Sequence, residues 1–149
     1  MITLRSFVPA DVPELVKLLN DGAVTRFLST KIPQPYTPGD ASWWVEEGSL
    51  LAMNWAIEVN GMLAGCIGVN RGEFEYARSG ELGYWLGAGF WQQGIASAAA
   101  RQIIAQVFED TDIERLFATV FSGNQASMAL LRKVGFTEEA VLQRAIFKN

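Results

Sequence analysis

Hydrophobic residues follow two different periods along this chain. Within residues 9–22, 94–109 and 124–136 they recur every three or four positions, as on one face of a helix. Elsewhere apolar and polar residues alternate, or short apolar runs lie between turn residues, which is typical of strands. These predicted strands are residues 3–7, 54–59, 62–70, 80–87, 115–121 and 137–149.

Turn and cap residues complete this picture. Asn60-Gly61 favours a type I′ turn, so the two apolar runs beside it are predicted to form a hairpin. Another helix is predicted over residues 39–51, with Asp40 or Ser42 as its N-cap. Gly22 is expected to end the first helix and Gly135 the last one. The order of elements is therefore β-α-α-β-β-β-α-β-α-β. It predicts one α/β domain over residues 1–149, in which the segment 80–121 makes a parallel strand pair through a right-handed crossover.

Composition narrows the classes of function. The chain has 149 residues with a net charge of −4, and its longest basic cluster is the pair Arg132-Lys133, so a nucleic-acid partner is not expected. It has no histidine and one cysteine, Cys66, which excludes histidine bases, Cys–His and Ser–His pairs and an internal disulfide. No metal site is expected. No apolar run spans a membrane and no leader precedes the first strand, so the expected location is the cytoplasm.

Candidate chemistry begins at Gly94, which lies between two glutamines and an alanine-rich helix. A glycine turn at a helix N-terminus offers unpaired backbone N–H groups at the positive end of the helix dipole. Phosphate is a common ligand of such a site. By itself the motif is weak, because a glycine there is also explained by a simple turn.

The combined motifs resemble a known family. The stretch "GELGYWLGAGFWQQGIASAAARQIIAQVFED" followed by "ERLFATVFSGNQASMALLRKVGF" looks like the GNAT acetyltransferases, and more narrowly their RimJ/RimL-like branch, which acetylates N-terminal amines of ribosomal proteins and small amines. The resemblance runs from Leu4 to Asn149. It implies a GNAT fold, classed α/β (α+β), with a mixed sheet of six to seven strands splayed between strands 4 and 5 and about four flanking helices. It implies acetyl-CoA (CoA) as the cofactor.

The same resemblance assigns a cofactor site. The family's pyrophosphate loop falls on Trp91 to Ala96, and Trp91 departs from its usual first residue, Arg or Gln. Backbone amides make most of the contacts in this motif, so the cradle survives that change. The pantetheine arm would lie between the splayed strands, beside the backbone of residues 84–86. The implied cofactor-binding residues are Tyr84, Trp85, Leu86, Trp91, Gln92, Gln93, Gly94, Ile95, Ala96, Ser97, Asn124 and Ser127.

Two catalytic residues are implied. Glu81 opens the fourth strand, where this branch often has a glutamate near the bound amine, and it would order a water or take the amine proton. Ser127, in the motif N-x-x-S, would stabilise the departing thiolate. Plain alternatives are a solvated charge for Glu81, local backbone bonding for Ser127 and capping for Asn124. The tyrosine acid of many GNATs is absent, because its position holds Leu131.

The function expected is acetyl-CoA-dependent N-acetyl transfer to a primary amine, a protein N-terminal α-amine or a small amine, by direct attack in a ternary complex. Two alternatives stay open: a catalytically weak acyl-CoA-binding module and a structural protein that kept the fold. The acceptor site is expected beside the first two helices and the loop 29–39, with the segment 72–79 nearby. The chain ends at Asn149, before the last strand usual in the branch, and three alternatives stay open: a short gene product, a cramped hairpin of residues 138–142 and 144–148, or a partner chain that supplies the missing edge. Since an unpaired sheet edge invites pairing between chains, a homodimer is expected.

Overall fold

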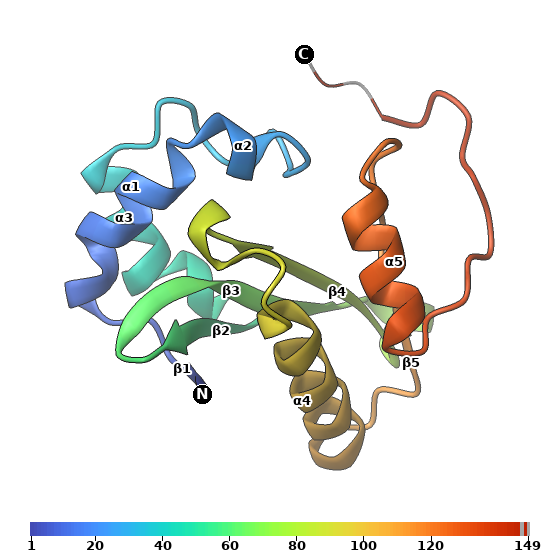
Figure 1. Cartoon of the computed structure of the whole chain (residues 1–149). Coiled ribbons are helices and arrows are strands. Elements are labelled where there is room, and N and C mark those ends of the chain that lie inside the picture. Colours follow the sequence, from blue (N-terminus) through green and yellow to red (C-terminus); the bar gives the residue numbers. More distant parts are fainter. Residues whose placement is uncertain (147, 149) are drawn as a thin grey trace.

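The computed structural model describes residues 1–146 and 148. Its five strands form one sheet in the order β1-β2-β3-β4-β5, with all neighbours antiparallel except β4 and β5, which are parallel (Figure 1). The strands are β1 (Ile2–Arg5), β2 (Met53–Val59), β3 (Met62–Arg71), β4 (Ser79–Leu86) and β5 (Arg115–Phe117). The α-helices are α1 (Val12–Leu19), α2 (Gly22–Thr25), α3 (Pro38–Glu46), α4 (Ile95–Asp110) and α5 (Gln125–Lys133).

The predicted hairpin between β2 and β3 is confirmed. Asn60 and Gly61 have φ angles of 50° and 82°, which is the left-handed pair that a type I′ turn requires. Met62 then pairs directly with Val59, and the register runs on to Val69 opposite Met53 with one irregularity after Ile57. This long central hairpin supplies most of the platform on which the helices pack (Figure 1).

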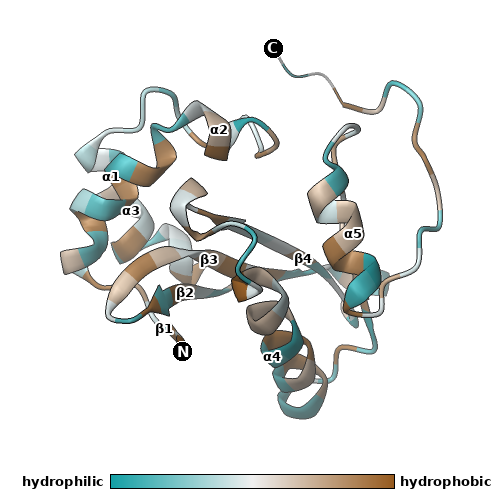
Figure 2. Ribbon diagram, in the orientation of Figure 1, coloured by the Kyte–Doolittle hydropathy of each residue, from teal (hydrophilic) through white to brown (hydrophobic). Residues whose placement is uncertain are grey.

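Each face of the sheet carries its own hydrophobic core. Side chains of alternate strand residues, such as Ile67 and Leu82, pack with α4 and the buried Leu131 of α5. On the opposite face, residues such as Ala56 and Cys66 pack with Leu15 of α1 and with α3. Figure 2 shows the hydrophobic colour running along β3, the strand that lies between the two layers. The sheet is therefore buried on both sides at its centre.

Helix ends differ in part from the sequence prediction. The N-cap of α3 is Thr37, not Asp40 or Ser42: Thr37 Oγ1 accepts from the Asp40 N–H at 3.1 Å and the Asp40 carboxylate accepts from the Thr37 N–H at 2.9 Å. This capping box suits Pro38 at the first helical position. Gly22 begins α2 instead of ending the first helix, because Asp21 caps the new turn by accepting from the Ala23 N–H.

The predicted helix stop at Gly135 is confirmed. Gly135 has a φ of 106°, its N–H donates to the Arg132 carbonyl, and the Phe136 N–H donates to the Leu131 carbonyl. These two bonds form a Schellman motif that ends α5.

The expectation of six to seven strands is wrong for the part of the chain that the structure describes. β5 ends at Phe117, four residues before the predicted end at Phe121, and residues 137–146 contain neither a strand nor a helix. Five α-helices are present in that part, where about four were expected. Instead of pairing, the C-terminal segment passes on the outer side of α5 (Figure 1). Its Lys148 ammonium reaches the carbonyl oxygens of Thr25 and Arg26, both at 2.8 Å.

Candidate active site

The sheet opens between β4 and β5. The two strands pair over only three positions, from Ser79 opposite Arg115 to Glu81 opposite Phe117. β4 then continues to Leu86, while the chain after Phe117 leaves the sheet. The predicted splay is present only in part, because β5 ends where the pairing ends and does not diverge as a strand. β4 presents five further residues, 82–86, to the opening.

Only alternate residues of β4 direct their backbone groups into this opening. The Gly87 N–H donates to Ala64 and the Gly72 N–H donates to Ser79, and the β3–β4 register between these bonds is unbroken. Odd-numbered β4 residues therefore bond to β3, and even-numbered residues face the other way. Tyr84 thus offers its backbone to the opening. Trp85 does not, so the arm-binding role expected for its backbone would break the ladder to β3.

Leu86 also faces the opening, but its carbonyl already has a partner. The Trp91 indole Nε1 donates to the Leu86 oxygen at 2.9 Å. This bond fixes the loop after β4 against the strand, and it gives Trp91 a structural reason to replace the residue usual in the family motif. Trp91 remains 44% exposed, so one side of the ring is accessible.

The loop from Trp91 to Gly94 leads into the N-terminus of α4, which is the positive end of the helix dipole. Gln92 and Gly94 have φ angles of 60° and 76°, and Gly94 is the N-cap of the helix without any side-chain cap. The first N–H with a partner at this end is that of Ala98, which donates to the Gly94 carbonyl at 3.0 Å. The preceding amides, of Ile95, Ala96 and Ser97, point along the helix axis toward the loop.

This arrangement fits a pyrophosphate without a cation. No lysine or arginine occurs within residues 87–100, so an anion there would be held by backbone N–H groups and the helix dipole. The side chains of residues 95–97 are buried in the core, which holds the amides in place. Among the two glutamines, Gln93 donates from Nε2 to the Gly89 carbonyl at 2.9 Å, which stabilises the loop itself.

Ser127 lies on the other wall of the opening. It is the third residue of α5, and its N–H donates to the side-chain oxygen of the N-cap Asn124 at 3.3 Å. The capping alternative for Asn124 is thereby confirmed. The Ser127 hydroxyl instead meets the Tyr84 phenol, with an Oγ–Oη distance of 2.6 Å. Burial raises the pKa of the Tyr84 phenol, and the hydrogen bond to Ser127 offsets only part of that shift.

The contact between Tyr84 and Ser127 was not predicted. From the sequence, only the backbone of Tyr84 is expected to contact the cofactor. The two residues are 43 positions apart, and no local pattern relates them. One signal was available in the sequence, because successive side chains of a strand point to opposite faces of the sheet. Tyr84 is therefore on the same face as the buried Leu82, which is the face that α5 covers.

Glu81 lies on the opposite face of β4 from Tyr84. It is half-buried and shares its face with Gly83 and with Trp85, which packs against the α1 and α3 core. A Cβ added at Gly83 would meet no atom within 4 Å, so open space lies beside Glu81. Glu81 is the last residue paired with β5, and it therefore stands at the mouth of the opening.

The absent family tyrosine is confirmed as a structural difference. Leu131 is 7% exposed and packs in the core shared with α4. An aliphatic side chain there donates no proton. The Tyr84 hydroxyl, contributed by β4 and not by α5, lies beside Ser127.

The expected acceptor segments lie at two ends of β4. The end of α1 reaches the end of β4, where a Cβ added at Gly87 would lie 2.6 Å from Leu18. The loop after α2 is tied to α1, because Asn20 and Tyr36 exchange two hydrogen bonds of 2.8 Å. The segment 72–79 lies at the start of β4, beside Glu81. Its acidic residues and those at the end of α3 are exposed: Glu46, Glu47, Glu73 and Glu75.

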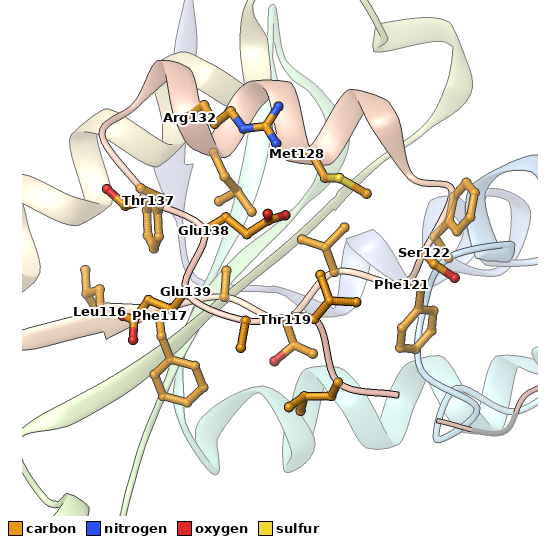
Figure 3. Close-up of a pocket in the computed structure, with 18 of the residues that line it drawn as sticks. Leu116, Phe117, Thr119, Phe121, Ser122, Met128, Arg132, Thr137, Glu138 and Glu139 are labelled. Carbon is orange, nitrogen blue, oxygen red and sulfur yellow. The ribbon is translucent and has the colours of Figure 1, made fainter. Parts of the chain in front are cut away.

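A separate cavity lies beside the chain that follows β5. A cavity of about 1220 Å³ separates the chain after β5 from the C-terminal segment, with α5 above it (Figure 3). Leu116, Phe117, Thr119 and Phe121 from β5 and the chain after it line the cavity, as do Glu138 and Glu139 from the C-terminal segment. Glu139 lies next to Phe117, since its carboxylate pairs with Arg115 at 2.7 Å. None of the residues expected to bind the cofactor or to act in catalysis lines it. It is the space left where residues 137–146 form no strand, so its size carries no argument for chemistry.

Two other site classes receive no support. Residues 1–146 and 148 contain no cluster of three or more side chains able to hold a metal ion. In the same part of the chain, no helix has the length and apolar character needed to cross a membrane. Cys66 of β3 is buried against α1 and α3. Burial raises the pKa of its thiol to about 12, so it is not a nucleophile.

Comparison with known proteins now defines the class. Residues 1–137 match the family of acetyltransferase (GNAT) domains, and the chain belongs to that family. It is therefore an N-acetyltransferase with acetyl-CoA as its acetyl donor.

Individual relatives support the RimJ/RimL-like branch. YdaF of Bacillus subtilis (strain 168), named as a ribosomal N-acetyltransferase, is 25% identical over 163 residues, covering 99% of this chain and 84% of the relative. The structure of RimL, a ribosomal L7/L12 α-N-protein acetyltransferase in complex with CoA, is 25% identical with a TM-score of 0.86, covering 98% of this chain and 85% of that one. An acetyltransferase from Salmonella typhimurium that modifies the N-terminal serine of L7/L12 is 28% identical with a TM-score of 0.83, covering 99% and 87%.

Proposed function

We propose that this chain transfers the acetyl group of acetyl-CoA to the α-amine of a protein N-terminus, by direct attack within a ternary complex. The observation that carries the proposal is the opening between β4 and β5, which has the α4 N-terminus at one end and the Tyr84–Ser127 pair on its walls. The acceptor class comes from the relatives, since the Salmonella protein acts on an N-terminal serine.

The cofactor is proposed to occupy this opening. Its pyrophosphate would bind the amides of residues 92–97, including those of Gln93 and Gly94, at the start of α4. Its pantetheine arm would lie along the side of β4 that faces away from β3, where the Tyr84 backbone has free hydrogen-bonding capacity. Asn124 contributes through the α5 N-terminus that it caps.

An α-amine needs little help from a catalytic base, because part of it is already neutral near pH 7. With a pKa of about 7.7–8.0, roughly a tenth of α-amines are neutral near pH 7, against well under a thousandth of lysine amines at a pKa of about 10.4. Glu81 is proposed to take the remaining proton through an ordered water, from the face of β4 where Gly83 leaves space. The amine would attack the thioester carbon as the C–S bond breaks, and Ser127 would hydrogen-bond the departing thiolate.

The acceptor class is tested with two peptides. One has a free N-terminus and no lysine, and the other has a blocked N-terminus and one lysine. We expect CoA thiol to be released with the first peptide and not with the second. Equal rates on both would contradict an N-terminal acceptor. Binding of acetyl-CoA without turnover on any amine of a wider panel would instead support the weak acyl-CoA-binding module. The buried Leu131 favours that alternative, because it occupies the position of the family's tyrosine acid.

A homodimer in the cytoplasm completes the proposal. β5 pairs only with β4 within the described residues, and its free edge invites pairing with a second chain. Val141 and Leu142, at 71% and 73% exposed, add apolar surface nearby. Light scattering at micromolar concentration should give twice the monomer mass. A monomer would contradict this part alone.

A further inference from the structure

The Tyr84–Ser127 hydrogen bond joins the two walls of the opening. Tyr84 comes from β4 and Ser127 from the first turn of α5, and both are partly buried. Their oxygen atoms are 2.6 Å apart, which is short for a hydrogen bond between hydroxyl groups. Within the described residues, no backbone pairing joins β4 to the chain beyond Phe117, so this side-chain bond spans the opening beyond the last paired residues.

The direction of the bond follows from what each hydroxyl can do. The Tyr84 phenol is the better donor, since its hydroxyl is more acidic than that of a serine, and its raised pKa keeps it protonated at neutral pH. Serine hydroxyls in a first turn often bond to local backbone. Here the local groups already have partners, because Ser127 N–H donates to Asn124 and the Asn124 carbonyl accepts from the Met128 N–H at 3.2 Å. Ser127 Oγ is therefore free to accept from Tyr84.

We propose that Tyr84 is a positioning residue that donates its hydroxyl proton to a hydrogen bond with Ser127 Oγ and so directs the Ser127 proton into the opening, toward the sulfur of the departing thiolate. This inference rests on the proposed function. It gives the side chain of Tyr84 a task in the reaction that is separate from the contacts of its backbone with the cofactor.

The pair acts by hydrogen bonding and not by giving up a proton. A phenol with a raised pKa and a serine hydroxyl both hold their protons more tightly than a thiol, whose ordinary pKa is about 8.5. When the C–N bond forms and the C–S bond breaks, its electron pair leaves on sulfur as a thiolate. The proton lost by the amine passes to water near Glu81, and the thiolate leaves as such or is protonated from solvent. Two aligned O–H dipoles stabilise the charge meanwhile.

The test is a double-mutant cycle of Tyr84→Phe and Ser127→Ala, measured on turnover and on acetyl-CoA binding. Tyr84→Phe keeps the ring and removes only the hydroxyl. We expect it to lower kcat about tenfold while the Kd for acetyl-CoA changes less than twofold. The double variant should be no slower than Ser127→Ala, because Tyr84 acts through Ser127. Ser127→Thr keeps a hydroxyl and should recover part of the rate.

Ser49→Ala is the matched control. Ser49 is buried and its hydroxyl donates to the Val45 carbonyl at 3.4 Å, on the far side of the sheet from Ser127. It should leave kcat unchanged, and thermal unfolding should show every variant folded.

The outcomes separate this inference from the function. A wild-type protein that turns over the peptide, with Tyr84→Phe within twofold of it, would overturn the inference alone. So would multiplicative losses in the double variant, or coupling seen in thermal stability but not in kcat. A wild type without turnover on any amine would overturn the proposed function, and the inference with it.

Discussion

Two openings border β5 and the chain that follows it, and they differ in kind. Polar groups converge on the opening toward β4: the amides of the α4 N-terminus, the Tyr84 backbone and the Tyr84–Ser127 hydroxyl pair. The cavity toward the C-terminal segment has a volume of about 1220 Å³, and apolar side chains such as Leu116 line it together with charged ones such as Arg132 and Glu138.

The proposed binding site is therefore marked by polar groups that the fold holds in place, and not by the volume of a cavity. A ligand site needs a few polar groups fixed in place by packing. In the β4–β5 opening each group is fixed: Trp91 holds the loop through Leu86, and Asn124 holds the start of α5. The C-terminal segment is held differently: residues 137–146 are exposed and form no regular element, and single side chains such as Glu139, paired with Arg115 at 2.7 Å, attach it.

The largest expected effect is at Gly94. Gly94→Ala should lower affinity for acetyl-CoA by about tenfold or more, because a Cβ would stand where the pyrophosphate approaches the amides. The added Cβ meets no protein atom within 4 Å, so any loss of affinity is not a packing defect. Isothermal titration with acetyl-CoA measures it.

Gly61→Ala is its control. Gly61 has a similar φ of 82° and equally open surroundings, so both variants should lose about 1 kcal/mol of stability from left-handed strain. Equal losses of acetyl-CoA affinity in the two would contradict a special role for the Gly94 loop.

Glu81→Gln should have the next largest effect. We expect kcat/KM for an N-terminal peptide to fall about tenfold near pH 7, within the range lost when a general base is removed. Acetyl-CoA affinity should be unchanged, since Glu81 lies on the face of β4 away from Ser127. The pH profile of kcat/KM from pH 6 to 9 is the measurement. Unchanged kcat/KM across that range would remove Glu81 from the mechanism.

On the cavity side, Leu142→Glu should leave catalysis alone. Leu142 is 73% exposed and lines the cavity, so the change alters that opening without touching the other. We expect kcat/KM and acetyl-CoA affinity within twofold of the wild type, and a smaller mass in light scattering if the C-terminal segment takes part in a dimer. A tenfold loss of acetyl-CoA affinity would show that the two openings are one site.

The smallest effect is expected from Cys66. Its thiol is buried and its pKa is raised to about 12, so a thiol reagent at pH 8 should detect almost none of it in the folded protein. Unfolding should release one equivalent per chain. Rapid reaction of the folded protein would contradict this burial. It would also interfere with assays that count released CoA thiol.

Features that depend on a few neighbouring residues could be predicted from the sequence. The Asn60-Gly61 turn and the stop at Gly135 each depend on a few adjacent residues with positive φ. The start of α4 after Gly94 is of the same kind. These were read correctly from the sequence.

What the sequence did not predict depends on distant partners. The last residues of the predicted fifth strand and residues 137–149 alternate like strands, yet within the described residues they lack a neighbour with which to pair. The unusable backbone of Trp85 follows from strand parity, which is known only once the β3–β4 register is known. The Tyr84–Ser127 bond joins residues 43 positions apart, so it required the fold.

The most direct test of the central claim is thermal unfolding with and without acetyl-CoA, in the wild type and in Gly94→Ala. At about one hundred times its Kd, a ligand that binds only the native state adds about 2.7 kcal/mol, which is several degrees for a domain of this size. We expect that shift in the wild type and a much smaller one in Gly94→Ala at the same acetyl-CoA concentration. An absent shift in the wild type, or an equal shift in both proteins, would contradict a cofactor site between β4 and β5.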